Sequence, residues 1–378
     1  MSANNHNKKN GLKIHRGHGF KHPTIPFKPT PGLSTAQVLD QMAETSFQAR
    51  SLGQAFQTWK RAIEDSTTIY LGLSGAMVPA GMREVIFHMI KNRYVDVIVS
   101  TGANLFHDIH ESLGGTYFKC PPTIDDIQLR KARMDRMYDV VGSDLEFIEV
   151  DKFIAHFAQS LPPKPYTTRE FFYRLGVRVA QHSQKDGIVT SAAKHGVPIY
   201  CPAIGDSSFG IALATWHRGK KSGKGADHSQ HFQFDVIRDV YETGRIALES
   251  QTTGMVLIGG GTPKNFTQQT WVTAEYMGQP EGGHKYCIQL TTDAPHWGGL
   301  SGCTFEESTS WGKIHFEANK VAAYVDATIG LTLLVQGLTD IQAQNLRKSK
   351  PTFIQGESLK MIPPGITPRA MKQEKILA

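Results

Sequence analysis

The chain has 378 residues, of which 40% are hydrophobic and 20% are charged, so a sizeable buried core is expected and wholesale disorder is excluded. Much of its net charge of +7 lies near the two ends, and no nucleic-acid recognition motif accompanies it, so no nucleic-acid partner is expected. Four irregularly spaced cysteines, an N-terminus without an apolar signal segment and the lack of any long apolar run predict a cytoplasmic protein that does not enter a membrane.

The predicted elements begin after a polar segment. Residues 1–30 are rich in His, Lys and Pro, which is typical of a flexible arm. A helix is expected from 35 to 64, where apolar residues recur with helical spacing. Further helices are predicted at 79–93, 124–138, 143–159, 167–183, 188–195, 227–247, 263–278 and 328–338. Short apolar strands are predicted at 67–73, 95–101, 197–203, 254–260, 284–292 and 320–327.

This alternation of strands and helices predicts the fold class. Buried apolar strands between amphipathic helices indicate an α/β protein, with a Rossmann-like, mostly parallel sheet and helices on both faces. Because neither a repeat nor a linker divides the chain, a single large domain is expected over residues 31–340. The flexible arm of residues 1–30 would precede it, and a solvated basic tail of residues 341–378 would follow it. The basic, Gly-rich segment 217–225 lacks the spacing of a phosphate-binding loop, so a surface loop is predicted there.

Small residues follow three of the predicted strands at their carboxyl ends. They form the segments 72–76, 100–104 and 259–262. In open α/β sheets ligands bind at this edge, where small residues let the backbone approach a dinucleotide and the following helices offer N–H groups to its phosphates. Tight turns alone would also explain the glycines, and the GxGxxG fingerprint is absent. Only the three segments together favour a nucleotide site.

Two carboxylates also follow predicted strands. Asp206 comes after the strand at 197–203, and Asp326 lies near the end of the strand at 320–327. A carboxylate at such a position can hydrogen-bond the hydroxyl groups of a ribose, and it can equally cap the helix that follows. Both interpretations stay open for Asp326, because a helix is predicted from residue 328.

The segment FEESTSWGKI at 305–314 carries the sharpest chemical signal. Trp311 and Lys313 are two residues apart, so on an extended chain both side chains would point to the same face. An indole beside the ammonium would desolvate the lysine and favour its attack on an imine or carbonyl carbon. Glu307 is close enough in sequence to bind a substrate ammonium or to move a proton. The competing interpretation is a packed indole with a lysine that reaches past it to solvent.

These residues resemble the deoxyhypusine synthases, over about residues 27–338. The most specific match is SWGKI at 310–314, which corresponds to the active-site lysine motif of that family. Further matches, in the family's order, are FQARSLGQA (47–55), LGLSGAMVPAGMREVI (71–86), VDVIVSTGANLFHDI (95–109), YCPAIGDSSFG (200–210), GMVLIGGGTPKN (254–265) and YVDA (324–327). The resemblance implies an NAD-dependent enzyme, assembled as a homotetramer of tight dimers with shared active sites.

The resemblance also implies roles for individual residues. Lys313 would be the nucleophile, with Trp311 and Glu307 beside it in the amine tunnel. The residues expected around NAD are Ser74, Gly75, Thr101, Gly102, Asp206, Gly259, Gly260, Thr292, Asp326 and Ala327. Those expected to contact the substrate are His107, Asn265, Trp311 and Glu307. No metal site is expected.

The sequence departs from the family's pattern at positions that bear on the substrate. Ile211 and Leu300 stand where the family has acidic residues that pair with substrate amines. His107 replaces a glutamate, Asn265 replaces a histidine, and Ala76 replaces an asparagine. A buried ammonium that loses its carboxylate partner forfeits a few kcal/mol, or ~100-fold in affinity. Spermidine is therefore not expected to bind as it does in standard members of the family.

The predicted function is an NAD-dependent transfer of an aminobutyl group, from a spermidine-like polyamine to an amine acceptor, through an imine on Lys313. The family's acceptor is a lysine of a translation factor, and the acceptor here is either such a protein lysine or a small amine. Two alternatives within polyamine chemistry are the conversion of agmatine to putrescine and the formation of homospermidine. A third alternative is a non-catalytic protein that binds NAD or polyamines. The presence of Glu307, Trp311 and Lys313 together argues against it, because a binding protein needs no imine-forming lysine.

Overall fold

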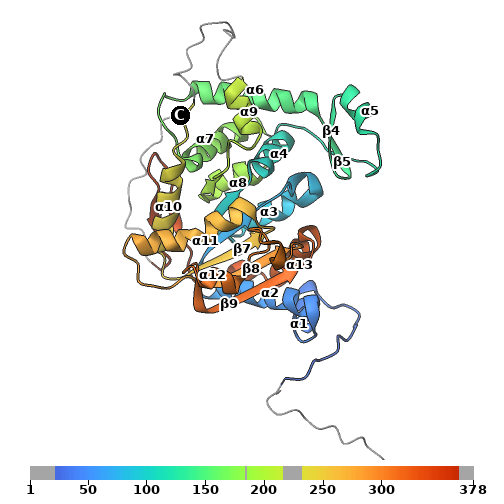
Figure 1. Ribbon diagram of the computed structural model, residues 1–378, viewed down its shortest axis with the longest axis vertical. Helices are drawn as coiled ribbons and strands as arrows, with labels where there is room; N and C mark the ends of the chain where they lie inside the picture. Colours follow the sequence, from blue (N-terminus) through green and yellow to red (C-terminus); the bar gives the residue numbers. More distant parts are fainter. Residues whose placement is uncertain (1–21, 184, 216–231, 366–378) are drawn as a thin grey trace, which may run out of the picture.

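The computed structural model describes residues 22–183, 185–215 and 232–365, and its centre is a six-stranded sheet (Figure 1). The strands run in the order β6–β2–β1–β7–β8–β9, and every neighbouring pair is parallel. Their bounds are β1 (Thr68–Leu73), β2 (Val97–Ser100), β6 (Ile199–Tyr200), β7 (Thr253–Ile258), β8 (His284–Thr291) and β9 (Ile314–Tyr324). The predicted Rossmann-like α/β sheet is confirmed.

Helices cover both faces of the sheet (Figure 1). Alternate residues of β1 show the two layers, because Ile69 and Leu71 lie in one hydrophobic core and Tyr70 lies in the other. The first core includes residues of α1 (Thr35–Ala43), α2 (Phe47–Glu64), α3 (Arg83–Lys91), α4 (Gly102–Ser112), α6 (Asp144–Ser160), α7 (Thr168–Ala180), α8 (Ile188–His195), α9 (Ser208–Thr215) and α13 (Ala327–Asp340). The second core includes residues of α10 (Val236–Glu249), α11 (Gly261–Tyr276) and α12 (Phe305–Thr309).

The helix expected from 35 to 64 is two helices, α1 and α2, which pack against each other. The chain turns at residues 44–46, and Phe47 adopts a left-handed backbone (φ 57°) with its ring exposed. Gly53 lets the helices touch, because a Cβ there would lie 2.3 Å from the amide nitrogen of Ala43. The apolar spacing therefore predicted the helical content correctly but not the reversal of direction.

The helix predicted at 124–138 is wrong over most of its length. The segment forms α5 (Asp126–Lys131), β4 (Met134–Met137) and β5 (Val140–Ser143), and β5 also pairs with β3 (Phe118–Lys119). Left-handed backbone at Arg133 (φ 58°) and at Tyr138 (φ 56°) ends the helix and turns the hairpin. We call residues 116–143 the hairpin arm, which lies at one edge of the molecule in Figure 1.

Other boundaries shift for local reasons. The helix expected at 79–93 is interrupted at Gly81 (φ 85°), which separates η1 (Val78–Met82) from α3. The sequence did not predict α4 and α9, because each follows a strand end that its small residues mark as a loop. β9 begins at Ile314 instead of residue 320. The strand thus starts immediately after Lys313, which brings this lysine close to the sheet.

Residues 342–365 are folded against the domain, whereas the sequence predicted a solvated basic tail over residues 341–378. They form η4 (Ala343–Asn345) and the antiparallel strands β10 (Thr352–Ile354) and β11 (Lys360–Ile362). The guanidinium of Arg347 is buried and lies 2.6 Å from the carboxylate of Asp96 in the core. Phe353 is buried in the second core. The folded domain therefore includes these C-terminal strands.

Three sequence predictions fall wholly or partly on residues that the structure does not describe. Residues 1–21 of the predicted N-terminal arm, the Gly-rich segment 217–225 and residues 366–378 of the predicted tail lie outside the described residues. Residues 22–30, the described end of the predicted N-terminal arm, are exposed. The backbone N–H of Ile25 donates to the carbonyl oxygen of Glu44 at 2.9 Å. In the described part of the chain, every helix is too short or too polar to span a bilayer.

Candidate active site

A cavity of about 260 Å³ opens at the carboxyl ends of β1, β2, β6 and β7. Its walls include Ser74, Gly75, Thr101, Gly102, Asp206 and Gly260, all of which the sequence predicted to lie around the cofactor. Ser301, from the segment between β8 and α12, also lines it. We call it the strand-end cavity. It occupies the edge of the sheet at which α/β proteins bind ligands.

Asn104 holds two loops of the strand-end cavity together. It is fully buried on the first turn of α4, and its Oδ1 accepts from the backbone N–H of Met77 at 2.7 Å. Its Nδ2 donates to Thr101 Oγ1 at 2.9 Å and to the carbonyl oxygen of Ser74 at 3.4 Å. Thr101 Oγ1 donates in turn to the carbonyl oxygen of Gly75 at 2.8 Å. In the sequence, Asn104 stands out only as a polar residue near a predicted strand end, which did not indicate this role.

Glycines allow chain segments to cross beside this cavity. A Cβ at Gly260 would lie 2.2 Å from Cα of Ser301, and one at Gly102 would lie 2.4 Å from Oγ of Ser207. The backbone N–H of Gly261 donates to Ser301 Oγ at 3.1 Å. α4 and α11 begin here, and the first N–H groups of a helix have no partners inside it. The cavity therefore offers positive helix ends and backbone donors to an anionic group.

The reactive-lysine motif forms a turn between α12 and β9, which we call the lysine turn (residues 310–313). The sequence predicted an extended chain here, but Gly312 has a left-handed backbone (φ 69°) that reverses it. The turn still brings the two side chains together, because the Nζ of Lys313 lies 5.3 Å from the ring centroid of Trp311. Nζ also donates to Asn265 Oδ1 at 2.9 Å. Glu307 is exposed on α12, just before the turn.

The lysine turn and the strand-end cavity meet on one helix. Gly261 lines the cavity at the start of α11, and Asn265 follows four residues later. This is about one helical turn, or ~6 Å along the axis. Asn265 Nδ2 donates to Gln269 Oε1 at 3.0 Å, which leaves its Oδ1 facing Lys313. The predicted neighbours Lys313, Trp311 and Asn265 therefore lie together, close to the predicted cofactor residues.

Other residues predicted around the cofactor lie outside this cavity wall. Gly259 directly follows β7, and its N–H donates to the carbonyl oxygen of Leu290 at 2.8 Å. Thr292 is exposed after β8. Asp326 caps α13 by accepting from the backbone N–H of Thr328 at 2.8 Å, and Ala327 is the first residue of that helix. The helix-cap interpretation of Asp326 thus holds in this structure.

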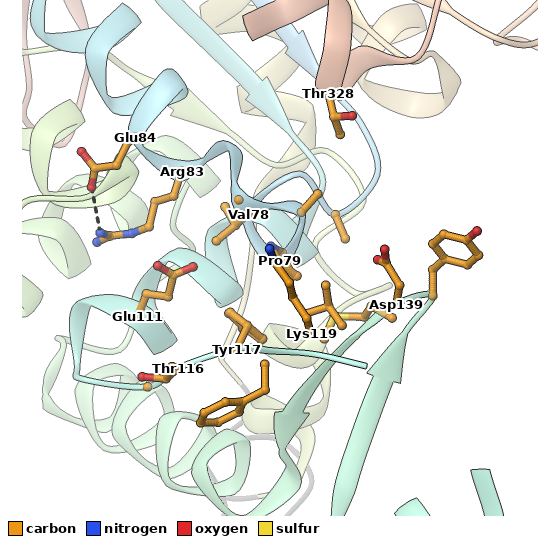
Figure 2. A pocket seen from close by; sticks show the side chains of 18 of the residues that line it. Val78, Pro79, Arg83, Glu84, Glu111, Thr116, Tyr117, Lys119, Asp139 and Thr328 are labelled. Atoms are coloured by element: carbon orange, nitrogen blue, oxygen red, sulfur yellow. Dashed lines mark ion pairs between the residues drawn. The ribbon is translucent and has the colours of Figure 1, made fainter. Parts of the chain in front are cut away.

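Asp326 instead lines a second, larger cavity, of about 1570 Å³, between the hairpin arm, η1 and the start of α13. Figure 2 shows Tyr117 and Lys119 of the hairpin arm, together with Pro79 and Thr328, among the residues that line it. We call it the arm cavity. Its volume exceeds that of a usual small-molecule site, and about a third of its lining residues belong to the hairpin arm.

His107 was predicted to contact the substrate, but it packs into an aromatic cluster. Its Nδ1 lies 2.6 Å from the hydroxyl of Tyr117, and its ring makes edge contacts with Phe106 and Phe147. Burial, and to a lesser degree the neighbouring His110, lowers the pKa of His107 to about 4, so its imidazole is neutral at pH 7. Among the described residues that line the two cavities, His107 does not appear.

Two of the departures from the family pattern, Ile211 and Leu300, are apolar and open to solvent. Ile211 is 58% exposed and Leu300 is 49% exposed, so neither position supplies a carboxylate or a closed pocket within this chain. Ala76 lines the arm cavity. In the part of the chain that the structure describes, no three potential metal ligands come together.

Comparisons with known proteins agree with these motifs. The family model described as deoxyhypusine synthase matches residues 37–338. A protein of Methanosarcina acetivorans named "Probable deoxyhypusine synthase 2" is 44% identical over 343 residues, which cover 90% of this chain and 96% of that protein. A protein of the same name from Archaeoglobus fulgidus is 46% identical over 304 residues, which cover 80% of this chain and 97% of that protein.

A bacterial relative and a solved structure extend the comparison. A "Deoxyhypusine synthase-like protein" of Coxiella burnetii is 38% identical over 301 residues, covering 79% of this chain and 83% of that protein. The crystal structure of a "putative deoxyhypusine synthase" from Entamoeba histolytica has a TM-score of 0.53 at 16% identity, and the match covers 82% of this chain and 95% of that chain. At that identity the structural likeness supports the fold alone.

Proposed function

The chain belongs to the deoxyhypusine synthase family, and on that premise we propose that it is an NAD-dependent aminobutyl transferase. Family membership implies a transferase that acts on a polyamine. The group would pass from a spermidine-like donor to an amine acceptor and would be carried by Lys313 on the way. The observation that supports this best is the position of Lys313, held by Asn265 and facing Trp311, one turn of α11 from the strand-end cavity.

The residues of the strand-end cavity fit a dinucleotide. The close crossings at Gly102 and Gly260 let the backbone approach a ligand, and the starts of α4 and α11 suit its phosphates. Asp206 offers a carboxylate to ribose hydroxyl groups. When bound there, NAD would accept a hydride from the donor carbon beside the reacting nitrogen and later return it, so the overall transfer is redox-neutral.

Lys313 supplies the covalent step. Its neutral amine adds to the imine carbon of the oxidised donor and expels the donor's diamine fragment, which leaves the aminobutyl group as an imine on Lys313. The acceptor amine then adds to that carbon and displaces Lys313, which regains its free amine. Asn265 orients Nζ through its bond to Oδ1, and the indole of Trp311 stabilises cationic amines. Glu307 is placed to exchange protons with solvent at this point.

The residues of this chain favour a second candidate for the donor. Ile211 and Leu300 cannot pair with the two ammonium groups of a standard polyamine. A donor with a planar guanidinium needs no such pair of carboxylates and can lie against an indole such as that of Trp311. We therefore propose agmatine as the second candidate donor: its aminobutyl group would pass to Lys313 with release of guanidine, and transfer to ammonia as the acceptor would give putrescine. Homospermidine formation is a variant of the first candidate.

A second copy of the chain would complete the site. Asp326 and Ala327 border the arm cavity in this chain, although the family pattern predicts both beside NAD. We propose that a partner subunit brings these residues to the strand-end cavity, in a homotetramer built from dimers. The four cysteines are free, which suits the proposed cytoplasmic location.

Mixed oligomers test this sharing. Lys313→Ala and Asp326→Ala chains would each be inactive alone, but a mixed dimer would contain one intact site. Random mixing should therefore restore about a quarter of wild-type activity. If both residues belong to the same chain, mixing restores none.

Product analysis tests the reaction. The protein would be incubated with NAD and, separately, with spermidine, putrescine or agmatine, each with and without an acceptor amine, and the products identified by mass spectrometry. Diaminopropane from spermidine would support the first candidate. Putrescine from agmatine, with spermidine inert, would support the second and would exclude modification of a protein lysine by an aminobutyl group.

Borohydride trapping separates an enzyme from a binding protein. An imine on Lys313 would be reduced to a stable adduct, seen as added mass on the peptide that contains this lysine. The adduct should require both NAD and the donor. NAD binding without any adduct or product would favour a non-catalytic protein.

A further inference from the structure

Lys264 is buried where the strand-end cavity meets the lysine turn, and the transfer chemistry described above leaves it without a role. It lies in the first turns of α11 and is 1% exposed. Its ammonium donates to Gln289 Oε1 at 3.0 Å and to the carbonyl oxygens of Ser301 at 3.3 Å and Cys303 at 2.6 Å. A protonated lysine has three N–H donors, so each donor has its own neutral acceptor.

The groups that Lys264 binds belong to separate parts of the site. Gln289 on β8 also donates its Nε2 to the carbonyl oxygens of Gly259 at 2.9 Å and Ser301 at 2.8 Å. Gly259 directly follows β7, and Ser301 lines the strand-end cavity. Cys303 lies two residues before α12, the helix that leads into the lysine turn. The ammonium thus joins a cavity wall to the segment that carries the reactive lysine.

We propose that Lys264 is a positioning residue of this active site. It holds Ser301 against the strand-end cavity and fixes the start of α12, while its chain neighbour Asn265 holds Lys313. Lys264 does not touch the reacting atoms and acts through these neighbours. The inference rests on the proposed function, because it assigns Lys264 a part in NAD binding and in the transfer that follows.

The proposal explains why an ionised lysine suits this buried position. A neutral amine would donate only two hydrogen bonds and would turn a lone pair toward an oxygen, so all three contacts require the ammonium. Burial lowers the pKa of Lys264 to about 8; the nearby Cys303, Glu307 and Asp293 oppose that change, and Lys313 adds to it. The three contacts should therefore begin to fail as the pH rises through about 8.

NAD affinity measured by calorimetry from pH 7 to pH 10 tests the inference. In the wild type, the affinity should fall as the pH passes about 8. Lys264→Met should bind NAD about tenfold more weakly at pH 7, as expected for the loss of buried hydrogen bonds, and should show no further fall above pH 8. Lys264→Arg keeps its charge over this range and should remove the alkaline fall. Equal NAD affinity of Lys264→Met and the wild type at every pH would overturn the inference.

Amide hydrogen exchange in residues 301–308 gives a readout that does not depend on turnover. Exchange should be faster in Lys264→Met than in the wild type and in the control Lys285→Met, which removes an exposed lysine from β8. Unchanged exchange would overturn the proposed role of Lys264 even in an active enzyme.

A wild type that transfers nothing from any donor would refute the proposed function, and the affinity and exchange results would then decide the inference on Lys264. If Lys264→Met fails to fold, the wild-type pH series and Lys264→Arg still decide it.

Discussion

Lys264 and Lys313 lie near the same end of α11, on either side of Asn265, and their surroundings are opposite in kind. Lys264 is 1% exposed, and its three donors are taken by neutral oxygens of the core. Lys313 is half-buried at a turn, where an amide oxygen and an exposed indole face it. This difference shows that the groups around each lysine determine whether it is structural or reactive. A fully bonded ammonium can hold structure but cannot attack, whereas a lysine at the rim can reach a substrate carbon.

The largest expected effect comes from removing the lysine at the rim. Lys313→Ala should lower kcat by on the order of 10³-fold or more, because the nucleophile is lost, while NAD affinity and assembly stay close to wild type. Product formation and calorimetry would measure the two properties separately. Borohydride adducts on Lys264, with transfer intact in Lys313→Ala, would reverse the roles assigned to the two lysines.

The stability of the fold should report the burial of Lys264. Its pKa in the folded chain, about 8, lies below the value of 10.5 for a free lysine, so between these pH values the unfolded chain binds a proton that the folded chain does not. The free energy of unfolding should therefore rise as the pH increases from 8 to 10.5. Below pH 8 the free-energy cost of burying the charged ammonium of Lys264 is fully present. The shift corresponds to ~3 kcal/mol at most.

Urea unfolding at pH 7 and pH 10 would measure this change. Only the difference between the wild type and Lys264→Met matters, since other groups titrate in both proteins. Lys264→Met also loses hydrogen bonds, but that loss lowers the free energy of unfolding by the same amount at each pH and does not alter its dependence on pH. The same pH dependence in both proteins would mean that Lys264 keeps a normal proton affinity and that the contrast between the two lysines is only geometric.

A substitution at Asn265 can hold Lys313 as an ammonium, the state in which Lys264 makes its structural contacts. Asn265→Asp would place a carboxylate against its ammonium and hold it protonated, and a protonated amine cannot attack. Transfer at pH 7 should fall about 10- to 100-fold and should recover as the pH rises. Asn265→Ser, which removes the contact without adding charge, should lose less activity and keep the wild-type pH profile. A pH profile of Asn265→Asp that matches the wild type would show that Asn265 does not face the reactive amine.

The sequence predicted the parts of this region that depend on local patterns. The buried strands are short apolar runs, so the parallel sheet followed from their alternation with helices. The lysine motif pointed to Lys313, and the turn at Gly312 brought Trp311 beside it although the sequence predicted an extended chain. Lys264 and Asn104 were missed, because their burial depends on segments far away in the sequence, such as Ser301 and Cys303 for Lys264.

The hairpin arm shows a second limit of predicting structure from sequence. Residues 124–138 have helix-like spacing, and the left-handed residues Arg133 and Tyr138 that interrupt it are not types that favour such a backbone. His107 packs against Tyr117 and Phe147 and lines neither cavity, a placement that depends on contacts the sequence pattern does not show. The predicted shared site at Asp326 needs a second chain, which the sequence of one chain cannot place.

The smallest expected effect is at the indole, and it tests the contrast from the side of the substrate. Trp311 is 66% exposed and faces Lys313, so it should act on cationic amines at the rim and not on the buried Lys264. Trp311→Leu should raise KM for the amine donor about threefold, as expected for an exposed cation–π contact, and Trp311→Phe should restore most of it. Steady-state kinetics would measure KM, and calorimetry should find NAD affinity unchanged. A loss of NAD affinity in Trp311→Leu would mean that the indole supports the cavity wall as Lys264 does, and the two lysine environments would then form a single structural unit.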